Sequence, residues 1–161
     1  MKYFGFENMR TLVAYHTKSG ASETYASTIA GTLKGKGFEV DLVNLKIAKP
    51  DITGYDLVVA GTGIRMFRIY GKWKKILKHK DIKSKKLAVF LSSGAAIENP
   101  QEAIDRWLQP LMDRYGLKPI SIGSFPGLIP EKMAQKPEHM NAVKPEIARQ
   151  WAEELADKLR S

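Results

Sequence analysis

The chain has 161 residues, of which 43% are hydrophobic and 27% charged, the composition of one ordinary globular domain. It contains no cysteine, which excludes disulfide frameworks, thiol nucleophiles and iron–sulfur clusters. No apolar run approaches the roughly 20 residues that span a bilayer, and residues 1–9 lack the pattern of a secretion signal. We therefore expect a cytoplasmic protein with a single domain over 1–161, in which 1–9 form an N-terminal extension.

The net charge of +9 is concentrated in one part of the chain. Residues 65–86, here called the lysine-rich segment, contain many lysines and arginines and only one acid, Asp81. This excess predicts a docking face for acidic partner proteins or for an anionic membrane surface. A merely solvated lysine face is the alternative. Nucleic acid is disfavoured as a partner, because no aromatic-rich strand or recognition helix accompanies the lysines.

Five short apolar segments predict β-strands. They span residues 11–16, 38–45, 56–61, 86–92 and 119–125. Strands that are apolar on both faces are typical of a parallel sheet covered by helices.

Helical spacing of apolar residues appears between these strands. The first expected helix has a stripe at Ala26, Ile29, Ala30 and Leu33 and ends near Gly35 and Gly37. A shorter stripe follows at Trp73, Ile76 and Leu77. The next helix starts with Asn99 as N-cap and Pro100, ends at Gly116, and has its stripe at Ile104, Leu108, Leu111, Met112 and Tyr115. The last helix follows Pro145, with a stripe at Ile147, Trp151, Leu155 and Leu159.

The order of these elements predicts an open α/β three-layer sandwich with a central five-stranded parallel sheet. The connection over 46–55 is too short and too broken for a proper helix. Residues 126–143 form one long loop, which we interpret as a lid or a binding loop. Ligands of such folds bind beyond the carboxyl ends of the strands.

The loop after the first strand carries the residues of an anion site. Thr17, Ser19 and Ser22 supply hydroxyl groups around Gly20, and the loop runs directly into the first helix, whose N-terminus has free N–H groups. These features fit a phosphomonoester. The glycine spacing of a Walker loop or of a dinucleotide-binding loop is absent. The alternative interpretation is a Ser/Thr-capped helix without a ligand.

The run Thr17-Lys18-Ser19-Gly20-Ala21-Ser22 resembles the phosphate loop of the flavodoxin family, and the resemblance extends over roughly residues 10–160. It implies the flavodoxin-like strand order 2-1-3-4-5, with helices on both faces, and FMN as the cofactor. It implies that Thr17, Lys18, Ser19, Gly20, Ala21 and Ser22 bind the phosphate. It also implies that the ring lies between Thr62, Gly63, Ile64, Arg65, Met66 and Phe67 on one side and Ser92, Ser93, Gly94, Ala95 and Ala96 on the other. We expect no metal site and assign no catalytic residue.

The ring-binding loops depart from the pattern of electron-carrier flavodoxins. Arg65 and Arg68 stand where acids are usual, and the run from Gly61 to Arg65 is similar to the branch of menaquinone-dependent protoporphyrinogen dehydrogenases. Positive charge near a reduced, anionic flavin predicts a less strongly reducing cofactor. The leading hypothesis is an electron carrier between redox partner proteins. The alternatives are a flavin-dependent oxidoreductase acting on a quinone or a protoporphyrinogen, and a flavin-free scaffold.

Overall fold

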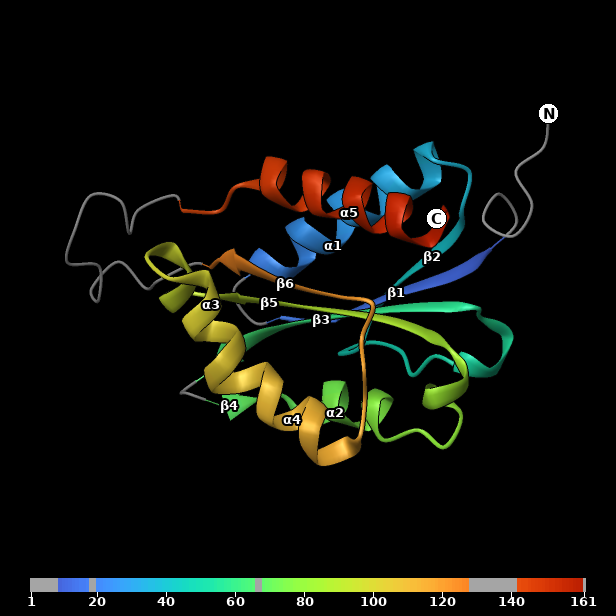
Figure 1. Ribbon diagram of the computed structural model, residues 1–161, viewed down its shortest axis with the longest axis horizontal. Coiled ribbons are helices and arrows are strands. Elements are labelled where there is room, and N and C mark those ends of the chain that lie inside the picture. Colours follow the sequence, from blue (N-terminus) through green and yellow to red (C-terminus); the bar gives the residue numbers. More distant parts are fainter. Residues whose placement is uncertain (1–8, 18–19, 66–67, 128–141, 161) are drawn as a thin grey trace.

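The computed structural model describes residues 9–17, 20–65, 68–127 and 142–160. Five parallel strands form the central sheet in the order β2-β1-β3-β5-β6, which confirms the expected topology (Figure 1). The strands are β1 (Arg10–His16), β2 (Glu39–Asn44), β3 (Leu57–Arg65), β5 (Lys86–Ser93) and β6 (Ser121–Pro126). A short additional strand, β4 (Arg68–Ile69), pairs antiparallel with the end of β3. The sequence analysis predicts a ring-binding loop in this region and does not predict the pairing of β4 with β3.

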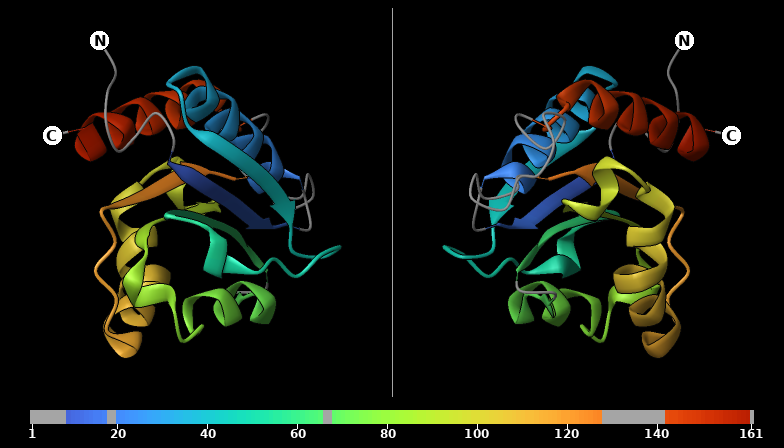
Figure 2. Two further views of the ribbon diagram at one scale, coloured as in Figure 1. Left: turned by 90° about the vertical axis from the view of Figure 1, so that its right-hand side faces the viewer. Right: turned by 90° about the vertical axis from the view of Figure 1, so that its left-hand side faces the viewer.

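Two long helices cover one face of the sheet, α1 (Ala21–Gly35) and α5 (Pro145–Arg160), as the side views in Figure 2 show. The predicted stripe of α1 is buried throughout, because its spacing of three and four residues turns it toward the sheet. In α5 one residue of the predicted stripe, Ile147, does not lie on the buried face. Ala148 is buried, whereas Ile147 is 38% exposed.

Shorter helices cover the opposite face: α2 (Gly71–Leu77), α3 (Pro100–Ala103) and α4 (Gln109–Tyr115). Asn99 caps α3 as predicted, since its side-chain oxygen accepts from the Glu102 N–H at 3.1 Å. A π-helical turn, η4 (Ile104–Leu108), separates α3 from α4, so the single regular helix predicted for this segment is wrong. Pro110 follows this turn. It has no N–H to donate to the preceding turn, and a π-turn is one way for a helix to accommodate that loss.

The predicted stripe of this interrupted helix is only partly buried. Leu108 and Met112 are fully buried, whereas Ile104, Leu111 and Tyr115 are half-buried. The wider π-turn changes the angular spacing of side chains, so a periodicity of 3.6 residues does not hold across it.

The connection between β2 and β3 contains only a 3-10 turn, η1 (Ile52–Gly54), which agrees with the prediction that it is too short for a helix. β2 is an edge strand with half-buried and exposed positions, and Leu42 is 41% exposed. The expectation that this strand is apolar on both buried faces is therefore wrong. An edge strand beside a helix-free connection has less protein to pack against.

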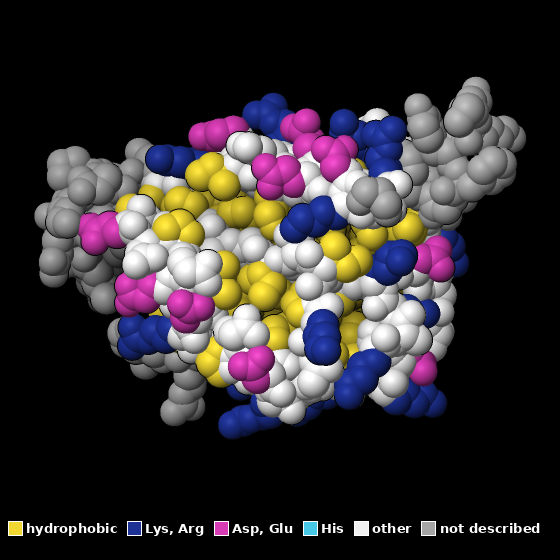
Figure 3. Space-filling view, viewed as in Figure 1, with side chains coloured by type: hydrophobic (Ala, Val, Ile, Leu, Met, Phe, Trp, Pro, Cys, Tyr) yellow, Lys and Arg dark blue, Asp and Glu magenta, His cyan; other side chains and the backbone are white. Residues whose placement is uncertain are grey.

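The other edge of the sheet, β6, lies between α5 and α4. Hydrophobic side chains gather along this edge in Figure 3. Ile120 is partly buried against the core on the α1 and α5 side of the sheet, and Ile122 against the core on the opposite side. Among the described residues, no helix has the length and apolar character required to cross a membrane.

Candidate functional site

The predicted site residues lie where β1, β3 and β5 end. In the parallel register His16 stands opposite Thr62, and Gly63 stands opposite Ser92, so the segments after these strands begin side by side. Ser22 of α1 joins them, because its hydroxyl lies 2.7 Å from the Ser92 hydroxyl in a buried hydrogen bond. Segments separated by as many as 70 positions therefore meet at one edge of the sheet.

Gly63 leaves space between these two serines. A β-carbon built on it would lie 3.5 Å from Ser22 Oγ and 3.7 Å from Ser92 Oγ, which is ordinary van der Waals contact. Thr62 is fully buried, and its hydroxyl donates to the Gly63 carbonyl oxygen at 2.9 Å. The end of β3 is thus small and hydroxyl-lined.

Thr17 and Gly20 are the described residues of the segment between β1 and α1. Gly20 has a φ of +96°, a left-handed conformation that favours glycine, and its N–H donates to Thr17 Oγ1 at 3.0 Å. No side-chain hydrogen bond caps α1 in the described structure. Among the described residues, the Thr17 hydroxyl thus accepts from Gly20 and not from a first-turn N–H group of α1, and free N–H groups at a helix start favour an anion. This favours the phosphate site over the Ser/Thr-capped helix without a ligand.

The segment after β5 is held by short local contacts. Ser93 Oγ accepts from the Ala96 N–H at 3.2 Å, which starts the 3-10 turn η3 (Ala95–Ile97). Gly127, which follows β6, donates its N–H to the Ser93 carbonyl oxygen at 2.7 Å. A β-carbon on Gly127 would lie only 2.8 Å from Ser93 N, so this close approach requires glycine. The sequence analysis did not assign Gly127 to the site.

Several predicted positions lie outside the described residues: Lys18, Ser19, Met66 and Phe67. The backbone pairs Arg65 with Arg68 across the β3–β4 hairpin, but their side chains are also outside the described part. Their expected effect on a flavin stays a prediction. The described phosphate-loop and ring-loop positions, by contrast, share one end of the sheet.

His16 and Tyr70 form a feature that the sequence analysis missed. Their rings stack at 4.0 Å between centroids with an interplanar angle of 19°. His16 is 8% exposed, and its Nδ1 has no hydrogen-bond partner among the described residues. Burial, followed by the nearby charges of Lys46 and Lys72, lowers the pKa of His16 below 6.5, so the imidazole is neutral at neutral pH. The only sequence signal was its position directly before Thr17.

Tyr25 of α1 anchors both ends of the long loop predicted over 126–143. Its buried hydroxyl donates to the Pro126 carbonyl oxygen and accepts from the Lys144 N–H at 3.1 Å. Burial raises the pKa of Tyr25 above 10.0, which keeps the hydroxyl protonated and able to donate. Most of the loop itself, residues 128–141, lies outside the described residues, so its interpretation as a lid stays a prediction.

The described residues contain no group of three or more histidine, aspartate or glutamate side chains that could hold a metal ion. The described phosphate-loop and ring-loop segments, 20–22, 62–64 and 92–96, contain no acidic residue. The site therefore offers hydroxyl groups, glycines and helix N–H groups. Hydroxyl and N–H groups donate hydrogen bonds to phosphate oxygens, so these residues fit a phosphate ester.

Comparison with known proteins gives the same fold. Among curated proteins, protoporphyrinogen IX dehydrogenase [quinone] of Escherichia coli (strain K12) is 32% identical over 71 residues, 44% of this chain and 39% of the relative. The match thus spans well under half of that protein's length.

Solved structures match over much more of the chain. Oxidised flavodoxin 2 from Bacillus cereus superposes with a TM-score of 0.66 at 24% identity, covering 92% of this chain and 99% of the other. The flavodoxin of Streptococcus pneumonia TIGR4 gives 0.66 at 17% identity, with the same two shares. At these identities the two matches show the fold alone. The family model described as "Flavodoxin domain" matches residues 12–137, more than half of the chain. This chain therefore belongs to the flavodoxin domain family.

Proposed function

We propose that the protein binds FMN at the carboxyl end of its sheet and carries electrons between redox partner proteins. The observation that carries this proposal is the Gly20–Thr17 contact before the start of α1, where no side-chain cap lies among the described residues, together with the Ser22–Ser92 hydrogen bond that joins α1 to the end of β5. Membership of the flavodoxin domain family supports the same cofactor.

The chain's own residues would bind and orient the cofactor. The N–H groups of Ala21 and Ser22 and the hydroxyls around Gly20 would hold the phosphate. The Ser22 hydroxyl would keep its bond to Ser92 and so position α1 against the ring-binding segments. When bound, the flavin ring accepts and donates the electrons.

The ring would lie between residues 62–67 and 92–96. Residues 62–64 and 92–96 offer small or apolar side chains and backbone groups, and Arg65 is the one charged residue of the two segments. Two such segments would exclude water from the faces of a planar ring, and the polar atoms at the edge of the ring would hydrogen-bond with the backbone.

The lysine-rich segment would guide acidic partners to this end of the sheet. The segment contains β4 and α2. Tyr70, which lies between them, stacks on His16 at the end of β1. Attraction between a positive face and an acidic partner raises the association rate and weakens as salt is added.

A second candidate is an FMN-dependent oxidoreductase. The observation in its favour is the similarity to a protein whose name states the oxidation of protoporphyrinogen IX with a quinone. The two candidates differ in one measurement. Rapid reduction of a soluble quinone by the reduced, FMN-loaded protein, with steady turnover and no acceptor protein, supports the enzyme. Electron transfer only to an acceptor protein supports the carrier.

The test of FMN binding compares FMN with riboflavin, which lacks the phosphate, by quenching of flavin fluorescence. We expect FMN to bind at least about tenfold more tightly, since a phosphate held by several N–H groups gains charge-assisted hydrogen bonds worth more than 1.4 kcal/mol in total. Ser22→Ala is expected to weaken FMN binding about tenfold, because it releases the ring segments from α1.

Ser27→Ala is the matched control, because Ser27 lies on the same helix at an exposed position. It should leave the affinity for FMN unchanged. Equal affinities for FMN and riboflavin would contradict the phosphate site. A protein that quenches neither flavin would be the flavin-free scaffold, and the proposal would be abandoned.

A further inference from the structure

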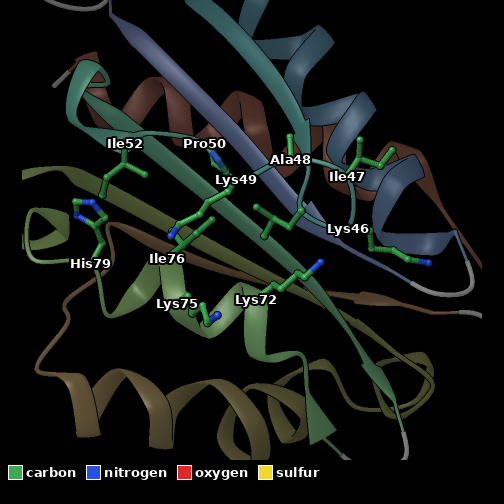
Figure 4. A pocket seen from close by; sticks show the side chains of 11 residues that line it. Lys46, Ile47, Ala48, Lys49, Pro50, Ile52, Lys72, Lys75, Ile76 and His79 are labelled. Atoms are coloured by element: carbon green, nitrogen blue, oxygen red, sulfur yellow. The ribbon is translucent and has the colours of Figure 1, made fainter.

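A cleft of about 260 Å³ opens between α2 and the connection that follows β2 (Figure 4). Its floor is apolar and consists of Leu45, Ile52 and Ile76, each at most 7% exposed. The cleft exists because the β2–β3 connection contains only the turn η1, so no α-helix fills the space beside α2. None of its lining residues belongs to the predicted FMN site.

The rim of the cleft is positively charged. Lys46 and Lys49 come from the connection, and Lys72 and Lys75 come from α2. All four lysines are exposed, and none of the lining residues is acidic. Within the described residues, none of the four forms an ion pair.

His79 closes one end of the cleft and is itself held in place. Its Nδ1 accepts from the Asp81 N–H at 3.0 Å, and the Asp81 carboxylate lies 3.9 Å away. Asp51 lies between the lining residues Pro50 and Ile52 but interacts with His79 and Lys85, and no described carboxylate forms an ion pair with the four lysines. Like charges gathered around a low-dielectric concave wall concentrate positive potential in it.

We propose that this cleft binds a small organic anion, with its apolar body on the floor and its acidic group among the four lysines. The lysines require negative charge from the ligand, because the cleft supplies none. The buried apolar floor requires a hydrophobic part, because a fully hydrated ion gains nothing from it. The volume suits one compact aromatic or short alkyl group carrying a carboxylate, sulfonate or phosphate.

The concave shape favours a small molecule over a membrane surface. In Figure 4 the side chain of Ile47 points away from the cleft, and it is 83% exposed. A flat lipid surface would contact Ile47 and the lysine tips but would not reach Leu45, Ile52 or Ile76. A ligand that enters the cleft uses the floor and the rim together.

The cleft is electrostatically connected to the end of β1. Lys46 and Lys72, which line it, both act on His16 and lower its pKa. A bound anion partly neutralises their field, so the pKa of His16 should rise when the cleft is occupied. An anion at the predicted phosphate loop also adjoins His16, so the rise counts for the cleft only together with amide shifts in residues 45–52 and α2.

The experiment uses the full chain and three probes: 1-naphthalenesulfonate, uncharged 1-naphthol and inorganic sulfate. Calorimetry measures affinity, and NMR follows the amide signals and the His16 titration. We expect 1-naphthalenesulfonate to bind at least about tenfold more tightly than either other probe, since only it satisfies both floor and rim. Its binding should shift the amide signals of residues 45–52 and of α2 and raise the pKa of His16.

The variant Lys49→Gln/Lys75→Gln should weaken this binding about tenfold. Lys34→Gln/Lys36→Gln, at the C-terminal end of α1, is the matched control and should bind the probe as the parent does. Both variants should keep the affinity of the parent for FMN, so failure of the cleft proposal is distinguished from failure of the proposed flavin site.

Three results would overturn the proposal. The first is equal affinity for 1-naphthalenesulfonate and inorganic sulfate, which would show that the floor is not used. The second is equal weakening by both lysine pairs, which would show general charge attraction. The third is cosedimentation with phosphatidylglycerol vesicles, lost in Ile47→Ser, without any binding of 1-naphthalenesulfonate. That outcome would identify the region as a membrane contact.

Discussion

Gly61 shows how one residue fixes the centre of the sheet. It lies in β3 opposite Phe90 of β5, and the Phe90 ring occupies the place that a β-carbon on Gly61 would take. Phe90 is itself fully buried and packs against Phe125 and Trp151. The ring therefore has no free space into which it could move.

We expect Gly61→Ala to lower the free energy of unfolding by about 1–3 kcal/mol, because the added methyl group overpacks the core. Gly31→Ala is a control of opposite sign. Gly31 is exposed in α1 with no atom near its missing β-carbon, so alanine should stabilise the helix by about 0.5–1 kcal/mol. Urea unfolding of both variants gives the comparison. A neutral Gly61→Ala would show that β3 and β5 can separate without cost.

Which site residues the sequence could predict depends on the kind of signal each one carries. Thr17, Gly20 and Ser22 could be proposed from the sequence because they form a local pattern beside a helix start. The His16–Tyr70 stack and the close approach of Gly127 to Ser93 arise from residues far apart in the chain. No single segment contains the information for such contacts.

At the scale of elements, patterns predicted the strands and helices wherever one periodicity continued. They failed where the helical periodicity is interrupted and where an edge strand has no helix packed beside it. Pro110 imposes a π-turn before α4, and β2 lies at an edge beside a connection without a helix. The β3–β4 hairpin escaped prediction because β4 is only 2 residues long and has no alternation to detect.

The turn between β1 and α1 gives a prediction at this scale. Gly20→Ala should destabilise the protein by about 1–2 kcal/mol, since a side chain is strained at a φ of +96°. The cost is conformational, because no atom lies within 4 Å of the added methyl group. Gly20→Asn should recover part of the loss, because asparagine tolerates left-handed backbone better than alanine. Thermal unfolding measures both, and equal losses would argue that the turn relaxes to another conformation.

For the molecule as a whole, tyrosines shape the stability at alkaline pH. Burial raises the pKa of Tyr55 to about 12. The Asp41 carboxylate, which accepts a hydrogen bond from the Tyr55 hydroxyl at 2.7 Å, contributes to this rise. Burial also raises the pKa of Tyr15 and of Tyr25. In the unfolded chain these groups lose their protons near pH 10.0, before the folded protein does. Their stabilising contribution is therefore complete below pH 10 and is lost as the pH rises.

We expect the free energy of unfolding to fall between pH 10 and about 12, and Tyr55→Phe to reduce that slope. The measurement is urea unfolding of parent and variant across this interval. Parent and variant differ only at this position, so the difference between the two curves isolates Tyr55. Parallel curves would show that the Tyr55–Asp41 bond does not persist in solution.

The attachment of Pro126 and Lys144 to the one hydroxyl of Tyr25 has a consequence for how this protein can diversify. Pro126 and Lys144 are thus both hydrogen-bonded to α1, and Gly127 is hydrogen-bonded to Ser93 at the site. Lengthening a loop between fixed ends costs only about 0.6 kcal/mol for each doubling. Stretches of different length and chemistry can thus be exchanged here while the sheet stays intact. New specificities can arise at this insertion point without redesign of the scaffold.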